Sequence, residues 1–93
     1  MLPLNVISER MQKLDNWSLE EHSIVKDYSF GNFKEALEFV NKIGEIAEKM
    51  NHHPDILISY NKIRLTLTTH SERTLTFKDF ELAEEIDKIK KSL

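Results

Sequence analysis

The fold is decided by residues 52–70, which read HHPDILISYNKIRLTLTTH. Two runs rich in β-branched and apolar residues, 56–60 and 63–69, lie on either side of a polar turn near Asn61. Runs of this length and composition around a short polar turn are typical of strands joined as a β-hairpin. The segment therefore predicts a hairpin with its turn near Asn61.

Histidines lie at both ends of this hairpin segment. His52 and His70 are each nine residues from Asn61, and His53 follows His52 directly. Antiparallel pairing of the two arms would therefore bring these side chains together at the open end of the hairpin. Because side chains alternate along a strand, His70 falls on the face opposite to the apolar residues of its own strand. An imidazole titrates at about 6.5, so histidines gathered there could exchange protons near neutral pH.

The chain before the hairpin alternates helical and extended periods. The spacing of apolar residues predicts a short helix over residues 6–14, strands over 17–20 and 24–30, and a long helix that begins after Asn32. Pro54 cannot continue that helix and disfavours helical geometry at the residue before it. We therefore expect the chain to become extended directly after His52 and His53.

The chain after the hairpin predicts a last helix. Thr76 followed three residues later by Asp79 resembles a capping arrangement at a helix start. The apolar stripe of this helix comprises Phe80, Ala83, Ile86 and Ile89, widened by Leu82 and Leu93. The resulting order is α-β-β-α-β-β-α, an α+β fold in which a four-stranded antiparallel sheet carries its helices on one face. We expect residues 1–93 to form a single domain.

Composition narrows the classes of function. The 93 residues contain no cysteine, which excludes a disulfide framework, a thiolate metal site and a thiol nucleophile. The net charge of −3 would repel a phosphate backbone, so we expect no direct nucleic-acid binding. The sequence has no basic leader and no apolar run near the ~20 residues that a membrane span needs. We expect a cytoplasmic protein with no membrane partner.

A longer pattern contains the histidines and resembles the signature of the pterin-4a-carbinolamine dehydratases. The pattern begins with Glu48, which three residues separate from His52-His53-Pro54. Five residues then separate Pro54 from Tyr60, nine separate Tyr60 from His70 and eight separate His70 from Asp79. Trp17 and the segments 60–62 and 68–70 are also similar to that family, over nearly the full chain. One position departs from the pattern, because many relatives place a glycine where this chain has Thr74, which concerns the loop after His70.

The resemblance implies an enzyme that removes water from 4a-hydroxytetrahydropterin to give quinonoid dihydropterin, the recycling step after a pterin-dependent aromatic amino acid hydroxylase. His52 and His70 would then be the acid and base, in an order that the sequence leaves open, and His53 would hold the pterin or its hydroxyl. The pterin is the substrate, so no cofactor and no metal is implied. The residues assigned to substrate binding are Trp17, Glu48, Asn51, Pro54, Thr68, Thr69, Ser71 and Asp79. Several have plain structural alternatives: Trp17 as a core residue, Asp79 as a helix-start residue and Pro54 as a helix stop.

Two other classes of function stay open. Three histidines with Asp79 would suit zinc, although adjacent His52 and His53 lack the one-face spacing of a strong metal motif. A non-catalytic interaction module is the second alternative, because animal members of the family also act as dimerisation cofactors for a homeodomain transcription factor. Sheet edges and the last helix offer surfaces for self-association, so we expect a homodimer or homotetramer.

Overall fold

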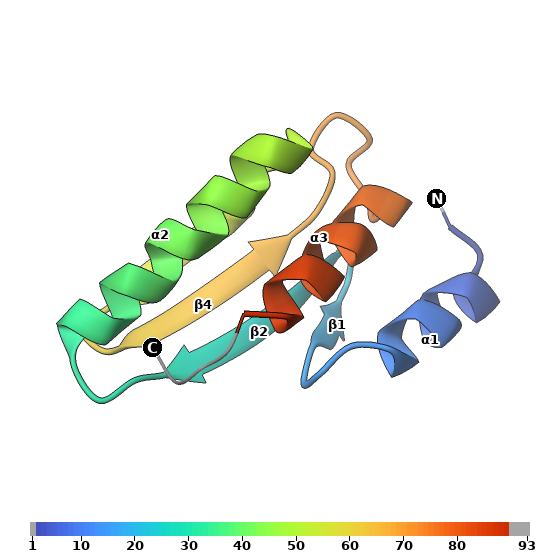
Figure 1. Cartoon of the computed structure of the whole chain (residues 1–93). Helices are drawn as coiled ribbons and strands as arrows, with labels where there is room; N and C mark the ends of the chain where they lie inside the picture. Colours follow the sequence, from blue (N-terminus) through green and yellow to red (C-terminus); the bar gives the residue numbers. More distant parts are fainter. Residues whose placement is uncertain (1, 90–93) are drawn as a thin grey trace.

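The computed structural model describes residues 2–89 and confirms the predicted order of elements. Figure 1 draws the chain in colours that follow the sequence from the N-terminus to the C-terminus. They are α1 (Leu4–Gln12), β1 (Ser18–Glu20), β2 (Ser23–Ser29), α2 (Phe33–Met50), β3 (Asp55–Ser59), β4 (Lys62–Leu67) and α3 (Phe77–Asp87). The α+β class is therefore confirmed, with the predicted bounds shifted by a few residues at several ends.

The four strands form one antiparallel sheet in the order β1-β2-β4-β3. Each predicted hairpin is present, and the two hairpins join through β2 and β4 at the centre of the sheet. Figure 1 shows α2 and α3 lying across one face of the sheet, with α1 beside β1. The strands β1 and β3 are the edges of this sheet.

The β3–β4 hairpin has a register that differs from the predicted one. Ser59 pairs with Lys62, so the turn consists of Tyr60 and Asn61, and its centre lies between these residues instead of at Asn61. Continued beyond the strands, this register sets His52 opposite Thr69, not opposite His70. The shift arises at Tyr60, whose φ of 55° is left-handed, a conformation uncommon for a bulky residue.

Strand β4 is also shorter than predicted. It ends at Leu67, and Thr69 instead makes an isolated bridge to Thr74 across the following loop. The left-handed residue of that loop is Arg73, with φ of 56°, so Thr74 does not have to adopt a glycine-type conformation there. The departure of Thr74 from the family pattern is therefore compatible with a closed loop.

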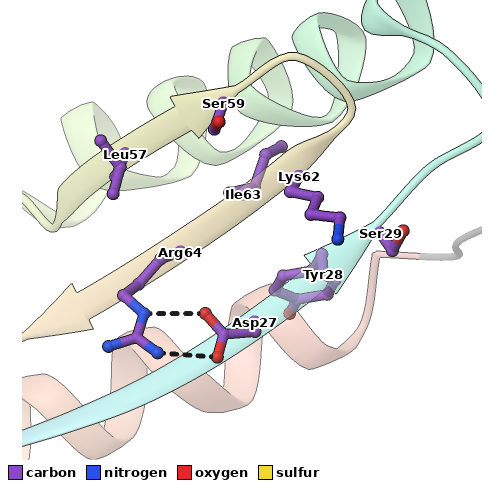
Figure 2. A pocket seen from close by; sticks show the side chains of 8 residues that line it. All are labelled: Asp27, Tyr28, Ser29, Leu57, Ser59, Lys62, Ile63 and Arg64. Carbon is purple, nitrogen blue, oxygen red and sulfur yellow. Dashed lines mark hydrogen bonds and ion pairs between the residues drawn. The ribbon is translucent and has the colours of Figure 1, made fainter.

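The face of the sheet away from the helices is open. Figure 2 shows a shallow hollow on it, where Arg64 of β4 donates to both carboxylate oxygens of Asp27 on β2, at 2.9 and 3.0 Å. Leu57 of β3 is exposed beside this pair. The predicted alternation of β4 is confirmed, because Ile63, Leu65 and Leu67 are buried while Arg64 is exposed.

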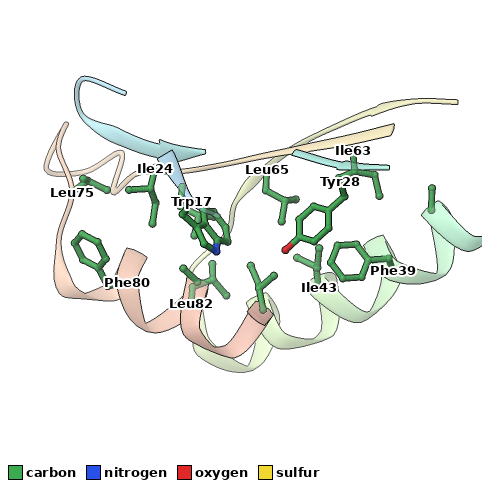
Figure 3. Packing of buried hydrophobic residues seen from close by; sticks show 14 of the residues in the cluster. Trp17, Ile24, Tyr28, Phe39, Ile43, Ile63, Leu65, Leu75, Phe80 and Leu82 are labelled. Carbon is green, nitrogen blue, oxygen red and sulfur yellow. The ribbon is translucent and has the colours of Figure 1, made fainter. Parts of the chain in front are cut away.

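The core fills the space between the sheet and the helices. Figure 3 shows side chains of the strands facing those of α2 and α3 across this layer. Phe39 and Ile43 enter it from α2, and Phe80 and Leu82 enter it from α3; all four are fully buried. The predicted stripe of α3 is thus confirmed over the described residues, and Leu93 lies outside them. On α2 the prediction is only partly right, because Phe33 and Leu37 are exposed although the apolar spacing predicts them on the inner face.

A buried charge lies at one end of this core. Lys26 of β2 is only 3% exposed, and its Nζ lies 3.0 Å from Oδ1 of Asp87 at the end of α3. The same carboxylate accepts the indole N–H of Trp17 at 2.9 Å and the backbone N–H of Asp15 at 3.0 Å. Burial first, and then the charges of Asp87 and Asp15, raise the pKa of Tyr28 well above its usual range. This cluster holds the N-terminal third of the chain to the C-terminal end of α3.

Candidate functional site

The end of α2 delivers the first two histidines. Asn51 caps this helix in the left-handed conformation, with φ of 53°, which asparagine tolerates better than most residues. The backbone N–H of His52 donates to the carbonyl of Ala47 at 3.1 Å, which closes the last turn. Pro54 follows, and β3 begins one residue later. The predicted change from helix to strand at the histidines is confirmed.

His52 is held by a buried carboxylate. Its Nε2 lies 2.6 Å from Oδ1 of Asp79, whose side chain is fully buried, while the His52 side chain is 11% exposed. Asp79 lies in the first turn of α3, where it forms the predicted capping box with Thr76. One carboxylate therefore both caps a helix and binds the ring of His52.

Thr69 joins the second arm of the hairpin to the same carboxylate. Its hydroxyl donates to Oδ2 of Asp79 at 2.8 Å and lies 2.7 Å from the hydroxyl of Thr76. Thr69 is itself buried. The residues that follow α2 and the residues that follow β4 thus meet at Asp79, as antiparallel pairing of the hairpin arms requires.

The other two histidines each lie beside a different carboxylate. His53 Nε2 is hydrogen-bonded to Glu48 on the last turn of α2, and both side chains are exposed. His70 Nε2 lies 3.7 Å from Oδ1 of Asp55 at the start of β3, and both are also exposed. His70 is exposed as expected, although β4 ends at Leu67 and the strand alternation used to predict this does not extend to it. Each of the three rings thus has its own acidic partner at the open end of the hairpin.

Asp55 is a residue of this region that was not predicted from the sequence. Its register partner is Thr66, so its side chain lies on the open face of the sheet, the face to which alternation also assigns His70. The alternation argument applied to His70 would have found Asp55 as well, had the register been known. A one-residue error in the turn is enough to move a partner to the other face.

Of the other residues predicted to bind the substrate, some lie near the histidines and some lie elsewhere in the fold. Thr69 and Ser71 line a hollow of about 280 Å³ together with Phe77. Thr68 instead donates its hydroxyl to the backbone carbonyl of His22 at 2.7 Å. The structure does not bring Trp17 to the histidines, because its indole is buried in the core and binds Asp87, at the opposite end of α3 from Asp79.

A metal site has no support in this geometry. Within residues 2–89, no three side chains of the His, Cys, Asp or Glu type are gathered where they could hold one metal ion. The three rings are distributed over three different carboxylates instead. The arrangement provides acid and base groups.

Comparison with known proteins shows which family the sequence resembles. The sequence profile of the family described as pterin 4 alpha carbinolamine dehydratase matches residues 2–89. A protein of Sulfolobus acidocaldarius, assigned provisionally by its name to the pterin-4-alpha-carbinolamine dehydratases, is 48% identical over 85 residues, which cover 91% of this chain and 93% of the relative. The chain belongs to the pterin 4 alpha carbinolamine dehydratase family.

Solved structures extend the likeness to the fold of this family. A structure described as the transcriptional coactivator/pterin dehydratase from Brucella melitensis is similar with a TM-score of 0.86 and 31% identity, over 91% of this chain and 93% of that one. A pterin dehydratase-like protein identified as a RuBisCO assembly factor in the alpha-carboxysome shares the fold at 17% identity, with a TM-score of 0.62 over 76% of this chain and 82% of that one. The pterin dehydratase fold therefore occurs in proteins described by different functions.

Among the helices of residues 2–89, none has the length and apolar character that a bilayer crossing requires.

Proposed function

We propose that this chain is a 4a-hydroxytetrahydropterin dehydratase that uses histidine acid–base catalysis. The observation that carries the proposal is the open end of the β3–β4 hairpin, where His52, His53 and His70 each lie beside a carboxylate. Membership of the pterin 4 alpha carbinolamine dehydratase family and the names of relatives support the choice of substrate.

The chemistry suits these groups. Dehydration needs one proton delivered to the departing 4a-hydroxyl and one proton removed from a ring N–H, so that a C–O bond breaks as a C=N bond forms. Imidazoles can do both near neutral pH, without a metal or a covalent adduct. The pterin is thus the substrate, in the recycling that follows a pterin-dependent hydroxylase. One of His52 and His70 delivers the proton to the departing hydroxyl, and the other removes the proton from the ring N–H. His53, together with Glu48, contacts the pterin or its hydroxyl.

The substrate would lie beside the loop that follows β4. The hollow lined by Thr69, Ser71 and Phe77 is the recess in this region, and Phe77 presents an exposed ring there. We propose that the pterin lodges at this loop and reaches the histidines from it. Asn51 and Pro54 serve through the backbone path that they impose on His52 and His53.

The test is direct. A pterin-dependent hydroxylase generates the 4a-carbinolamine, and its dehydration is followed spectroscopically with the wild-type chain, His52→Ala and His70→Ala. The wild type should accelerate dehydration, and each variant should lose about 10²–10⁴ in rate, the usual share of one general acid or base. His22→Ala is the matched control, because this histidine belongs to the β1–β2 turn and its backbone carbonyl, which binds Thr68, is retained. If the wild type adds nothing to the spontaneous rate, the enzymatic proposal fails and a purely binding role takes its place.

We further propose that the chain acts in the cytoplasm as a homodimer or homotetramer. The edge strands β1 and β3 leave backbone groups free for pairing, and α2 carries exposed Phe33 and Leu37. Light scattering at micromolar concentration should give a mass of two or four chains, and a mass of one chain would contradict this part of the proposal.

A further inference from the structure

Phe77 presents an aromatic ring where α3 begins. It is the first residue of this helix and is 46% exposed. The ring lines the hollow of about 280 Å³ beside the loop that follows β4, and the other lining residues of the described chain are polar: Thr69, Ser71, Glu72, Thr76 and Lys78. Binding sites for small molecules usually measure ~300–1,000 Å³, so this hollow suits a single bicyclic ring. Phe77 is the apolar wall against which such a ring would lie.

Arg10 of α1 covers one side of this ring. Its guanidinium carbon lies 5.4 Å from the centroid of the Phe77 ring and 5.6 Å from that of the buried Phe80 ring. Both distances are within the ~6 Å at which a cation interacts with an aromatic face. The same guanidinium donates through Nη2 to Oε2 of Glu84 at 3.2 Å. Phe77, Phe80 and Glu84 are spaced at i, i+3 and i+7, so Arg10 lies along one stripe of α3.

The contact with the two rings accounts for an unusual feature of Arg10. Within residues 2–89 its Nε is buried and has no hydrogen-bond partner. A buried donor without an acceptor is normally costly, but the negative faces of the Phe77 and Phe80 rings attract the guanidinium and offset this cost. Because the cation holds one side of the Phe77 ring, this ring cannot turn freely between rotamers. The part of the ring that stays exposed is the part that lines the hollow.

We propose that Phe77 is the platform on which the pterin ring stacks, and that Arg10 is a positioning residue that holds this platform in place. This inference rests on the proposed function and names what selects a flat bicyclic substrate. Dehydration converts the ring carbon that bears the hydroxyl from tetrahedral to trigonal, so the pterin is flatter in the transition state than in the substrate. A flat ring stacks better on an aromatic face, and Phe77 therefore binds the transition state more tightly than the substrate. The hydroxyl leaves from the face of the pterin that is turned away from Phe77, because the stacked face is closed to water.

Binding of oxidised pterin tests the platform without any turnover. Proton NMR should show the ring protons of the pterin shifted upfield in the complex with the wild type, because they lie over an aromatic face. Phe77→Leu should abolish this shift and raise Kd by about two- to twelve-fold, the share of one aromatic pair, while Phe77→Tyr keeps both. Phe33→Leu is the matched control, since Phe33 is the first residue of α2 and is 47% exposed. An unshifted pterin in the wild type, or equal Kd in Phe77→Leu and Phe33→Leu, would overturn the inference.

Kinetics tests whether stacking acts in the transition state and whether Arg10 supports it. Phe77→Leu should lower kcat/KM by about two- to twelve-fold, with part of this loss in kcat. A loss confined to KM would refute the preference for the flatter ring. Arg10→Met removes the cation over the ring, so it should lower kcat and weaken the upfield shift of bound pterin, and Arg10→Lys should restore part of both. Glu84→Gln removes the ion pair and leaves the guanidinium over the rings, so equal losses in Arg10→Met and Glu84→Gln would refute the positioning role.

The two proposals fail separately. If the wild type has no dehydratase activity but shifts the ring protons of oxidised pterin upfield, and Phe77→Leu abolishes the shift, the proposed function fails and the platform stands as a pterin-binding site. If activity is present but Phe77→Leu and Phe33→Leu have the same kcat/KM, the dehydratase stands and Phe77 is not the platform.

Discussion

The buried charge of Lys26 makes Asp87 a costly residue to remove. In Asp87→Ala the ammonium of Lys26, only 3% exposed, loses the carboxylate at 3.0 Å. Among the carboxylates of residues 2–89 it keeps Asp15, whose exposed side chain lies 3.8 Å away. Leaving one member of a buried pair without its partner costs about 3–5 kcal/mol. A domain of this length is stable by roughly 5–14 kcal/mol, so the variant should lose about a fifth or more of its free energy of unfolding.

Urea denaturation followed by circular dichroism measures this loss. We expect a lower midpoint at an unchanged slope, and in thermal unfolding a decrease in Tm of at least about 12 °C. The double variant Lys26→Met/Asp87→Ala should recover the part of the loss that comes from the unpaired ammonium, because a buried pair replaced by apolar groups is often neutral. It should not recover the part that comes from the hydrogen bonds of Trp17 and Asp15 to Asp87. Lys88→Met is the matched control, since its partner Glu85 is a surface residue and the midpoint should not move. If Asp87→Ala and Lys88→Met have the same midpoint, the reasoning about the buried charge is wrong.

Three further predictions concern other parts of the fold. Gly44→Ala should stabilise α2 by about 0.5–1 kcal/mol, because a Cβ there meets nothing within 4 Å; a lower urea midpoint would mean that this position packs against another chain. Phe39→Ala should cost about 3–5 kcal/mol in urea denaturation, because the ring is fully buried and its centroid lies 4.6 Å from that of Tyr28; a loss below about 1 kcal/mol would contradict this packing. Burial raises the pKa of Tyr28 above its ordinary value of 10.0, so its contribution to stability is complete below that pH and is lost as the pH rises toward the folded-state pKa. The free energy of unfolding should therefore fall above about pH 10, less so in Tyr28→Phe than in Tyr60→Phe, and equal slopes in these variants would refute the assignment.

The elements of the fold were predictable because their signals are local. The apolar spacing of α2, its cap at Asn32 and the stop at Pro54 each act within a few residues, and the structure confirms all three. The capping box of Thr76 and Asp79 is equally local and is also confirmed. Such signals depend on backbone sterics and nearby hydrogen bonds, which sequence alone contains.

The contacts of the site were less predictable because they depend on register. The centre of the turn lies half a residue earlier in the chain than predicted. Asp55 therefore pairs with Thr66, and Thr69 lies opposite His52, where His70 was expected. That choice depends on Tyr60, which adopts a left-handed φ that no propensity favours for tyrosine. The sequence could therefore name the three histidines and Thr69, but not Asp55 and not the contact of Thr69 with Asp79, since both follow from this register.

The dual use of Asp79 has a consequence for how this protein can change. Oδ2 of Asp79 caps α3 and Oδ1 holds His52, so a substitution that removes both oxygens perturbs the helix and the ring together. An evolving copy could not discard the ring's support gradually while keeping a well-capped α3. A descendant that abandoned catalysis would have reason to retain this aspartate for folding alone, and its presence in a relative is therefore poor evidence of activity.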